Sequence, residues 1–170
     1  DGGRMSAARV WLMLRWMGHD RVAVLDGGWQ AWLAQDGEVT TDVPTPAPTT
    51  YRMRLRPELL ADVDEVDRHR QHARTCVFDS RGAEGYHGGG VYHDPVRGHI
   101  AGAGLADRAN TTNSDLTFRS PAELRAYYLE LLDGVDPEEV IYYCGSGITA
   151  AQNVLGMQIA GLQGSRMYVG

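Results

Sequence analysis

Several residue types that would define a structural or binding class are scarce in this sequence. It contains no lysine and only two cysteines, Cys76 and Cys144. Two cysteines are too few for a disulfide framework or for a zinc site built from cysteines. We therefore expect a reducing, cytoplasmic setting in which at least one thiol is free to react.

Positive charge and long apolar runs are also lacking. The formal net charge is -6 over 170 residues, which argues against general binding to nucleic acid. No apolar run approaches the roughly 20 residues that a membrane span requires, so no membrane association is expected. The chain opens on DGGRMS without an initiator methionine, and we expect it to be a fragment truncated at both ends.

Helical and extended patterns alternate along the chain, which predicts an α/β fold with a mainly parallel sheet flanked by helices. Two helix starts carry capping boxes, with Asp62 and Glu65 in one, and Ser120 and Glu123 in the other. In such sheets, ligands bind beyond the carboxyl ends of the strands. The pattern predicts helices over 6–17, 29–37, 61–73, 120–132 and 149–162, and strands over 21–28, 75–81, 140–143 and 165–170.

A proline-rich stretch, VPTPAPTT over 43–50, cannot form a packed element, because proline removes backbone donors and fixes φ. It indicates a linker over 41–56. We expect 1–40 to be the C-terminal part of one domain and 57–170 to be a second domain whose final segment is missing.

The beginning of the chain resembles its end when shifted by 143 positions. Asp1 then falls on Cys144, Ala7 on Ala150 and Gly18 on Gly161, without a gap. This indicates a duplicated α/β domain in which only the second copy carries the thiol. The first copy would therefore be inactive.

Cys144 occupies a position suited to a reactive thiol, in the stretch VIYYCGSGITAA over 140–151. A thiol attacks as its thiolate, and the amino end of a helix carries partial positive charge that favours an anion. The glycines of the following loop allow successive amides to converge on one point. Cys76, inside TCVFD, is interpreted instead as a buried core cysteine.

Two phosphate-binding loops are excluded by their spacing. A P-loop requires a Gly-Lys-Ser/Thr sequence, and the chain has no lysine. A cysteine phosphatase would need an arginine six residues after the cysteine, where this chain has Ala150. The loop is therefore expected to hold a smaller or less charged group than a phosphate dianion.

Several motifs resemble the tandem-domain sulfurtransferases of the rhodanese family. CGSGITA over 144–150 is similar to the loop of the mercaptopyruvate branch, and DSRGAEGY over 79–86 resembles the family's DARxxxRY. DPVRGHIAGA, DLTFRSPAEL and the stretch over 7–32 also resemble family segments, in family order. The resemblance implies a catalytic rhodanese-like domain preceded by the C-terminal part of an inactive one.

The resemblance also implies a reaction. Cys144 would take sulfur from mercaptopyruvate, or from thiosulfate as a second choice, and pass it from a persulfide to a thiol, such as that of thioredoxin, or to cyanide. No cofactor or metal is expected. The substrate-binding residues would be Arg81 together with the loop residues Gly145, Ser146, Gly147, Ile148 and Thr149.

Some positions depart from the family pattern. The family has a donor-binding arginine where this chain has Gly85, which leaves Arg81, and Arg97 less strongly, as the anion-binding candidates. Arg81 could equally form a structural pair with Asp79. These departures keep a second reading open, in which the chain is a non-catalytic rhodanese-like module that binds a partner or senses sulfide.

The histidines have structural interpretations. His99, in a Gly-His-Ile segment, is interpreted as part of a turn beside the sheet rather than as a base. His87 and His93 share a loop with Asp94 but lack the defined spacing of metal ligands.

Overall fold

A single parallel sheet forms the centre of the molecule and confirms the predicted fold class. The structure, a computed structural model, describes residues 5–90 and 95–169. In this part of the chain the strand order is β1-β5-β4-β2-β3, and each pair of neighbours is parallel. The strands are β1 (Leu60–Ala61), β2 (Val77–Asp79), β3 (Gly104–Leu105), β4 (Ile141–Tyr143) and β5 (Arg166–Tyr168).

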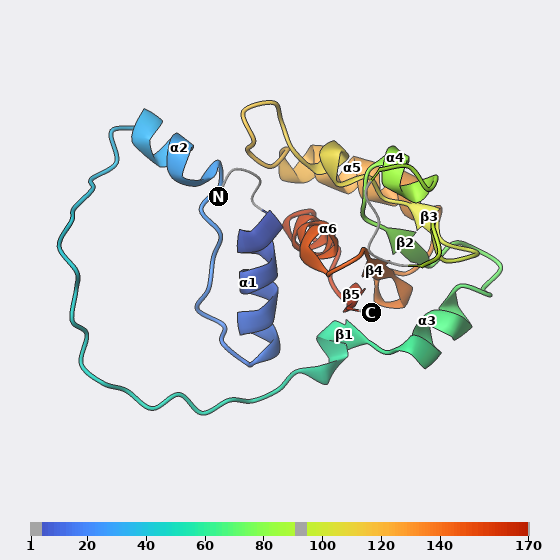
Figure 1. Ribbon diagram of the computed structural model, residues 1–170, viewed down its shortest axis with the longest axis horizontal. Coiled ribbons are helices and arrows are strands. Elements are labelled where there is room, and N and C mark those ends of the chain that lie inside the picture. The colour runs from blue at the N-terminus through green and yellow to red at the C-terminus, as the bar shows by residue number, and fades with distance from the viewer. Residues whose placement is uncertain (1–4, 91–94, 170) are drawn as a thin grey trace.

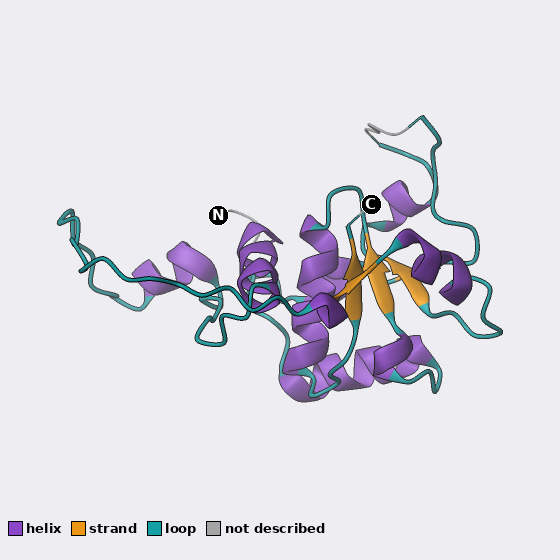
Figure 2. Cartoon of the chain, turned by 90° about the horizontal axis from the view of Figure 1, so that it is seen from below, coloured by secondary structure: helices purple, strands orange, loops and turns teal. Residues whose placement is uncertain are grey.

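Helices cover both faces of the sheet (Figures 1 and 2). Strand residues alternate between two buried clusters, so Phe78 and Tyr142 face one layer while Val77 and Ile141 face the other. The α-helices are α1 (Met5–Trp16), α2 (Gly28–Ala34), α3 (Val63–His69), α4 (Ala83–Tyr86), α5 (Pro121–Leu132) and α6 (Ile148–Ile159). Short 3₁₀ helices span Pro57–Leu59, Arg108–Thr111 and Pro137–Glu139.

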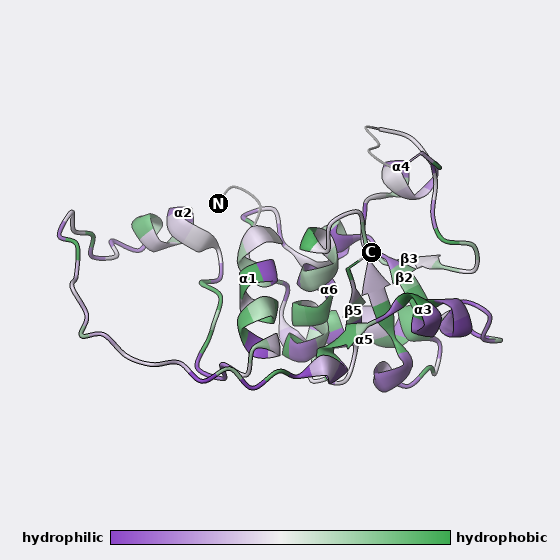
Figure 3. Cartoon of the chain, turned by 60° about the horizontal axis from the view of Figure 1, so that its bottom comes forward, coloured by the Kyte–Doolittle hydropathy of each residue, from purple (hydrophilic) through white to green (hydrophobic). Residues whose placement is uncertain are grey.

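Helix α6 lies in the middle of the larger layer. Residues 150–157 are all buried, because the sheet, α5 and α1 surround the helix. Figure 3 shows apolar colour on parts of α6 and of the sheet, whereas α3 is mostly hydrophilic. Val66 is the buried residue of α3, and it packs with Val77 and Ile141 on the opposite face of the sheet.

Helix α1 packs against α6 through Ala8, Trp11 and Leu12 (Figure 1). The two helices begin at Met5 and Ile148 and end at Trp16 and Ile159, so both ends are separated by the same 143 positions as the sequence offset. The duplication itself stays a prediction.

The predicted linker over 41–56 contains no helix or strand, as expected from its prolines. It forms the long excursion seen in Figure 1 and is exposed along nearly its whole length. At its end it returns to α1, where the amides of Arg54 and Arg56 donate to the carbonyls of Met17 and Trp16. The domain boundaries placed on this linker stay predictions.

One predicted strand is wrong. Residues 21–28 are extended or turning but pair with no strand among the described residues. An isolated strand leaves its backbone groups unpaired, so β-structure forms only where a neighbour completes the ladder. The apolar pattern that suggested a strand instead places Val22 and Val24 against the core cluster of α1 and α6.

Both predicted capping boxes are present. The side chain of Asp62 accepts from the Glu65 amide, and the side chain of Ser120 accepts from the Glu123 amide. In each case the glutamate side chain accepts from the N-cap amide in return. The sequence pattern did not reveal β1, β3 or α4, which are short, and it placed Ala61 of β1 at the start of the helix predicted over 61–73.

Gly156 of α6 provides a test of this packing. An added Cβ would collide with the hydroxyl of Tyr128, which is held by donation to Asn153. We expect Gly156→Ala to lower the free energy of unfolding by about 1–3 kcal/mol, as overpacked cores do. Urea unfolding measures the change.

The double variant Gly156→Ala/Tyr128→Phe is the matched control, because it removes the hydroxyl that the new methyl group would meet. The loss caused by Gly156→Ala should be smaller in the Tyr128→Phe background than in the wild type. Equal losses in the two backgrounds would contradict this account of the α5–α6 contact.

Candidate active site

Cys144 follows directly after β4, in the short turn that leads into α6. The three residues of β4 are buried, and Cys144 itself is a partly exposed free thiol. The carboxyl end of a parallel strand and the amino end of a helix therefore meet at the sulfur. Both features favour binding of an anion at this place.

The sulfur accepts a backbone hydrogen bond within its own loop. The amide of Gly147 donates to Cys144 Sγ at 3.0 Å. Gly147 is the N-cap of α6 and has φ 73°, in the left-handed region that side chains disfavour. The glycine at this position therefore allows the turn that brings the amide onto the sulfur.

The other loop residues have different environments. Gly145 and Ser146 are exposed, and the Ser146 carbonyl accepts a hydrogen bond from the guanidinium of Arg9. Ile148 and Thr149 are partly buried, and Thr149 Oγ1 has no hydrogen-bond partner in the described part of the chain. Of the amide cradle predicted over Gly145–Thr149, the hydrogen bond from Gly147 is the contact observed at the sulfur, and the rest stays a prediction.

A cavity of about 370 Å³ lies in front of the thiol. It brings together the carboxyl ends of β2 and β4 and the segment before β3, as parallel topology requires. The lining residues are Arg81, Val96, Arg97, Gly98, His99, Ile100, Tyr143, Cys144 and Gly145.

Arg81 lines this cavity but is also committed to a buried partner. Its Nε and Nη2 atoms donate to the carboxylate of Asp79, which is fully buried, and Nη2 also donates to the carbonyl of Gly98. Of the two roles predicted for Arg81, the pair with Asp79 is observed. Donor binding by Arg81 stays a prediction.

At Gly85, where the family has an arginine, the side chain of Arg81 lies close to the backbone. A Cβ atom at Gly85 would lie 3.3 Å from Cβ of Arg81. The aliphatic stem of Arg81 thus occupies the space beside Gly85, so a larger residue at this position would have to displace it.

His99 and Tyr143 also face the cavity, and sequence reasoning did not assign either to the site. His99 stacks on Tyr86 with ring centroids 3.7 Å apart, and His99 Nδ1 lies 2.9 Å from the Tyr86 carbonyl. The Tyr143 hydroxyl accepts from the Ile100 amide, and burial raises the pKa of Tyr143 well above its usual range. The signal for Tyr143 was its position next to the cysteine at the strand end.

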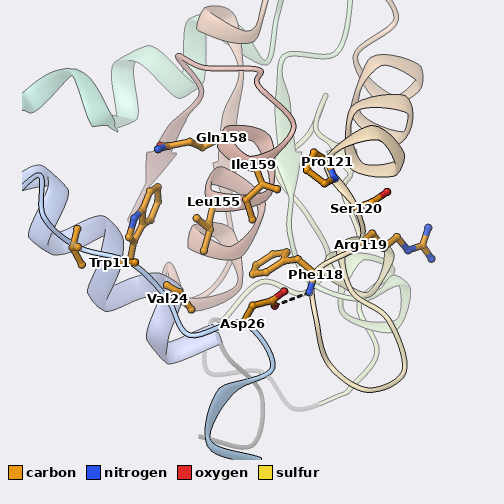
Figure 4. Close-up of a pocket in the computed structure, with 12 residues that line it drawn as sticks. Trp11, Val24, Asp26, Phe118, Arg119, Ser120, Pro121, Leu155, Gln158 and Ile159 are labelled. Atoms are coloured by element: carbon orange, nitrogen blue, oxygen red, sulfur yellow. Dashed lines mark hydrogen bonds between the residues drawn. The ribbon is translucent and has the colours of Figure 1, made fainter. Parts of the chain in front are cut away.

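A larger cavity of about 600 Å³ lies elsewhere, between residues 22–26, α1, α6 and the start of α5 (Figure 4). Its walls include Trp11, Val24, Phe118 and Leu155, and the Asp26 carboxylate accepts from the Phe118 amide. The cavity does not include Cys144. We interpret it as imperfect packing between two layers rather than as the centre of the chemistry.

Metal ligation finds no support in the described residues. They contain no group of three or more histidine, cysteine or acidic side chains arranged to hold an ion. His93 and Asp94, considered with His87 as ligands, lie outside the described residues. Within the described ranges, no helix has the length and apolar character needed to cross a bilayer.

Known proteins resemble this chain in sequence and in fold. Residues 1–35 match the profile of the Rhodanese-like domain. The whole chain is 33% identical to a probable 3-mercaptopyruvate sulfurtransferase of Pseudomonas aeruginosa and 32% identical to a thiosulfate sulfurtransferase of Rattus norvegicus. The chain spans 60% and 58% of these two relatives, respectively.

Solved structures match the fold over nearly the whole chain. SseA from Escherichia coli, a 3-mercaptopyruvate sulfotransferase with the rhodanese fold, aligns with TM-score 0.79 and 26% identity, covering 100% of this chain and 64% of SseA. Wild-type EanB aligns with TM-score 0.83 at 24% identity, covering 97% of this chain and 41% of EanB, which shows likeness of fold alone.

The molecule is thus a parallel α/β domain with a thiol at the sheet's carboxyl edge. Its fold is the rhodanese fold of SseA, and its sequence is similar to curated 3-mercaptopyruvate and thiosulfate sulfurtransferases.

The Asp79–Arg81 pair predicts a stability effect. Arg81→Met would leave the Asp79 carboxylate buried without its cation, which costs about 3 kcal/mol in comparable pairs. We expect a clear fall in the urea midpoint for Arg81→Met and a smaller one for Arg81→Lys. Arg97→Met, at an exposed arginine of the same cavity, should change the midpoint little, and an equal loss in both would contradict the assignment.

The two thiols should differ in reactivity. Cys76 is 1% exposed, its Sγ donates to the Arg74 carbonyl, and burial raises the pKa of its thiol. Iodoacetamide should therefore modify Cys144 in the folded protein and Cys76 only after unfolding. Peptide mass spectrometry identifies the modified residue, and comparable rates for the two thiols in the folded chain would contradict the structure.

Proposed function

We propose that this chain carries the reactive site of a sulfurtransferase, with Cys144 as nucleophile and persulfide carrier. The observation that supports this most directly is the hydrogen bond from the Gly147 amide to Cys144 Sγ, at a helix start and facing a cavity. A donor amide placed at the sulfur stabilises the thiolate and would equally stabilise a charged persulfide.

The first half of the reaction loads the thiol. The Cys144 thiolate attacks the sulfur of mercaptopyruvate, an S–S bond forms and the C–S bond breaks. The electron pair of the C–S bond leaves with the enolate of pyruvate, which then takes a proton. With thiosulfate, the S–S bond of the donor breaks instead and sulfite leaves with its electron pair.

The second half unloads it. A thiolate acceptor, such as that of reduced thioredoxin, or cyanide attacks the outer sulfur of the persulfide. The persulfide bond breaks and returns the electron pair to Cys144 as thiolate. Sulfur therefore moves from donor to acceptor while the protein returns to its starting state, without a metal or a redox cofactor.

Mercaptopyruvate is our first choice of donor. The loop GSG carries no charged side chain, so it suits a small keto acid better than the doubly charged thiosulfate. The arginines at the cavity, Arg81 and Arg97, supply positive charge for the donor carboxylate. The relatives include a probable 3-mercaptopyruvate sulfurtransferase and a thiosulfate sulfurtransferase, which supports sulfur transfer in general. A 25%-identical structure, EanB with a cysteine persulfide and ergothioneine, provides a persulfide precedent on this fold.

A second candidate is a non-catalytic module that binds a partner or senses sulfide. The observation that favours it is the occupation of Arg81 by Asp79 and Gly98, which reduces its capacity to bind a donor anion. The two functions differ in whether the thiol accepts sulfur from a donor.

Intact-mass measurement tests the proposal. After incubation with mercaptopyruvate and removal of excess donor, we expect the chain to gain the mass of one sulfur atom, and cyanide should remove it. Cys144→Ser should gain none, whereas Cys76→Ser should still be loaded, because Cys76 is buried in the core.

Thiosulfate provides the comparison arm, and loading by it should be slower than loading by mercaptopyruvate. Failure of both donors to load the thiol, or an adduct that persists in Cys144→Ser, would exclude Cys144 as the sulfur carrier and favour the binding module.

A further inference from the structure

A residue from the first helix reaches the cysteine loop from 137 positions away in the sequence. Arg9 of α1 donates from Nη1 to the carbonyl of Ser146. Its Nε atom is buried and has no hydrogen-bond partner in the described part of the chain. Arg9 is not among the residues that line the cavity in front of Cys144. Arg9 therefore contacts the candidate site through the backbone carbonyl of Ser146.

The peptide group contacted by Arg9 is the same one that contacts the sulfur. The Ser146 carbonyl and the Gly147 amide belong to one planar unit whose electrons are delocalised over O, C and N. Arg9 binds the oxygen of this unit, and its N–H donates to Cys144 Sγ at 3.0 Å. A cation at the carbonyl polarises the peptide, so its N–H becomes a stronger donor.

We propose that Arg9 is a positioning residue for Cys144, acting through the Ser146–Gly147 peptide to orient the Gly147 amide and strengthen its hydrogen bond to the thiolate. The proposal requires Cys144 to react as a thiolate but does not require sulfur transfer. It gives α1 a part in the site although α1 contributes no side chain to the cavity.

The guanidinium of Arg9 fits beside residue 147 only because that residue is glycine. A Cβ atom at residue 147 would collide with Nη1 of Arg9 and would lie 3.2 Å from Met167 Sδ. Gly147 therefore serves two needs, since its φ is positive and its missing side chain leaves room for the guanidinium.

The position of Arg9 is fixed by the packing of its helix. Its neighbours Ala8, Trp11 and Leu12 are buried against the core that includes α6. Arg9 is partly buried and lines a small cavity together with Leu12, Met13 and Met167, while its charged end reaches the loop.

Other charged and titratable groups also face the thiol. They line the cavity in front of it and are Arg81, Arg97, His99 and Tyr143. Arg81 is paired with Asp79, whereas the charge of Arg9 is directed at the carbonyl of the loop. An effect of Arg9 on the thiolate can therefore be separated from the effects of the cavity groups by changing Arg9 alone.

The experiment measures thiol reactivity against pH in the full chain. Three variants are compared with the wild type: Arg9→Met, Arg9→Lys and Arg15→Met. Methionine keeps most of the aliphatic stem of Arg9 and removes the charge. Arg15 is the matched control, because it lies on the same helix, where it packs over Trp11 and pairs with Asp20. The probe is the neutral disulfide dithiodipyridine, so removal of a charge does not change its attraction to the protein.

If the proposal holds, the pH profile of Arg9→Met moves upward by about one unit. A thiolate of higher basicity is also intrinsically more nucleophilic, with a Brønsted slope of about 0.4–0.5. The rate at pH 7 should therefore fall about threefold, while the plateau at high pH should equal or exceed that of the wild type. Arg9→Lys should lie between the two profiles, and Arg15→Met should match the wild type.

In the Arg9→Met variant the rate is expected to be lower than in the wild type at pH 7 but equal or higher at high pH. This pH dependence distinguishes the positioning role from a merely structural one. If Arg9→Met has the wild-type profile, or reacts more slowly or faster by the same factor at every pH, the proposal is overturned. An equal shift in Arg15→Met would also overturn it. Circular dichroism and urea unfolding verify that the variants are folded, and if Arg9→Met is not, the Arg9→Lys profile decides, with an unshifted profile counting against the proposal. Because no sulfur donor is used, this result is independent of whether Cys144 accepts sulfur.

Discussion

The left-handed conformation of Gly147 is the constraint on which the site depends. It turns the chain between β4 and α6 so that an amide faces backward onto the preceding cysteine sulfur. Parallel strand order then brings the ends of β2 and β4 and the segment before β3 around that sulfur. One residue without a side chain thus allows a thiol, a helix start and a cavity to coincide, which is why the candidate site lies at this edge of the sheet.

Local sequence signals predicted the elements that are stabilised locally. The capping boxes at Asp62 and Ser120 are complete within four residues, so their patterns could be read without knowledge of the fold. The segment 21–28 shows the opposite case, since its apolar alternation depends on a neighbouring strand that the described residues do not provide. The two-residue strands β1 and β3 form only because longer neighbours pair with them, and a sequence pattern contains no sign of that.

The part of the candidate site that is contiguous in the sequence could be predicted. The residues that the fold brings together from separate elements could not. Cys144 and the glycines after it stand together in the chain, so the thiol and its loop could be recognised as a unit. His99, Tyr143 and Arg9 come to the loop from other elements, and only the packing of the sheet and of α1 brings them there. Arg81 could be predicted as either a binding or a pairing residue, and the depth of Asp79, which decides its main contact, is a property of the folded sheet.

The exposed excursion over residues 37–56 gives α1 a particular relation to the rest of the molecule. Its proline-rich part over 43–50 connects α1 to the rest of the chain and raises the local concentration of α1 near α6. Its last residues also contact the end of α1, through the Tyr51 hydroxyl and the amides of Arg54 and Arg56. A single proteolytic cut within residues 43–50 would leave these contacts to α1 in place. It would nevertheless convert the docking of α1 into an association of two separate chains, whose occupancy depends on dilution.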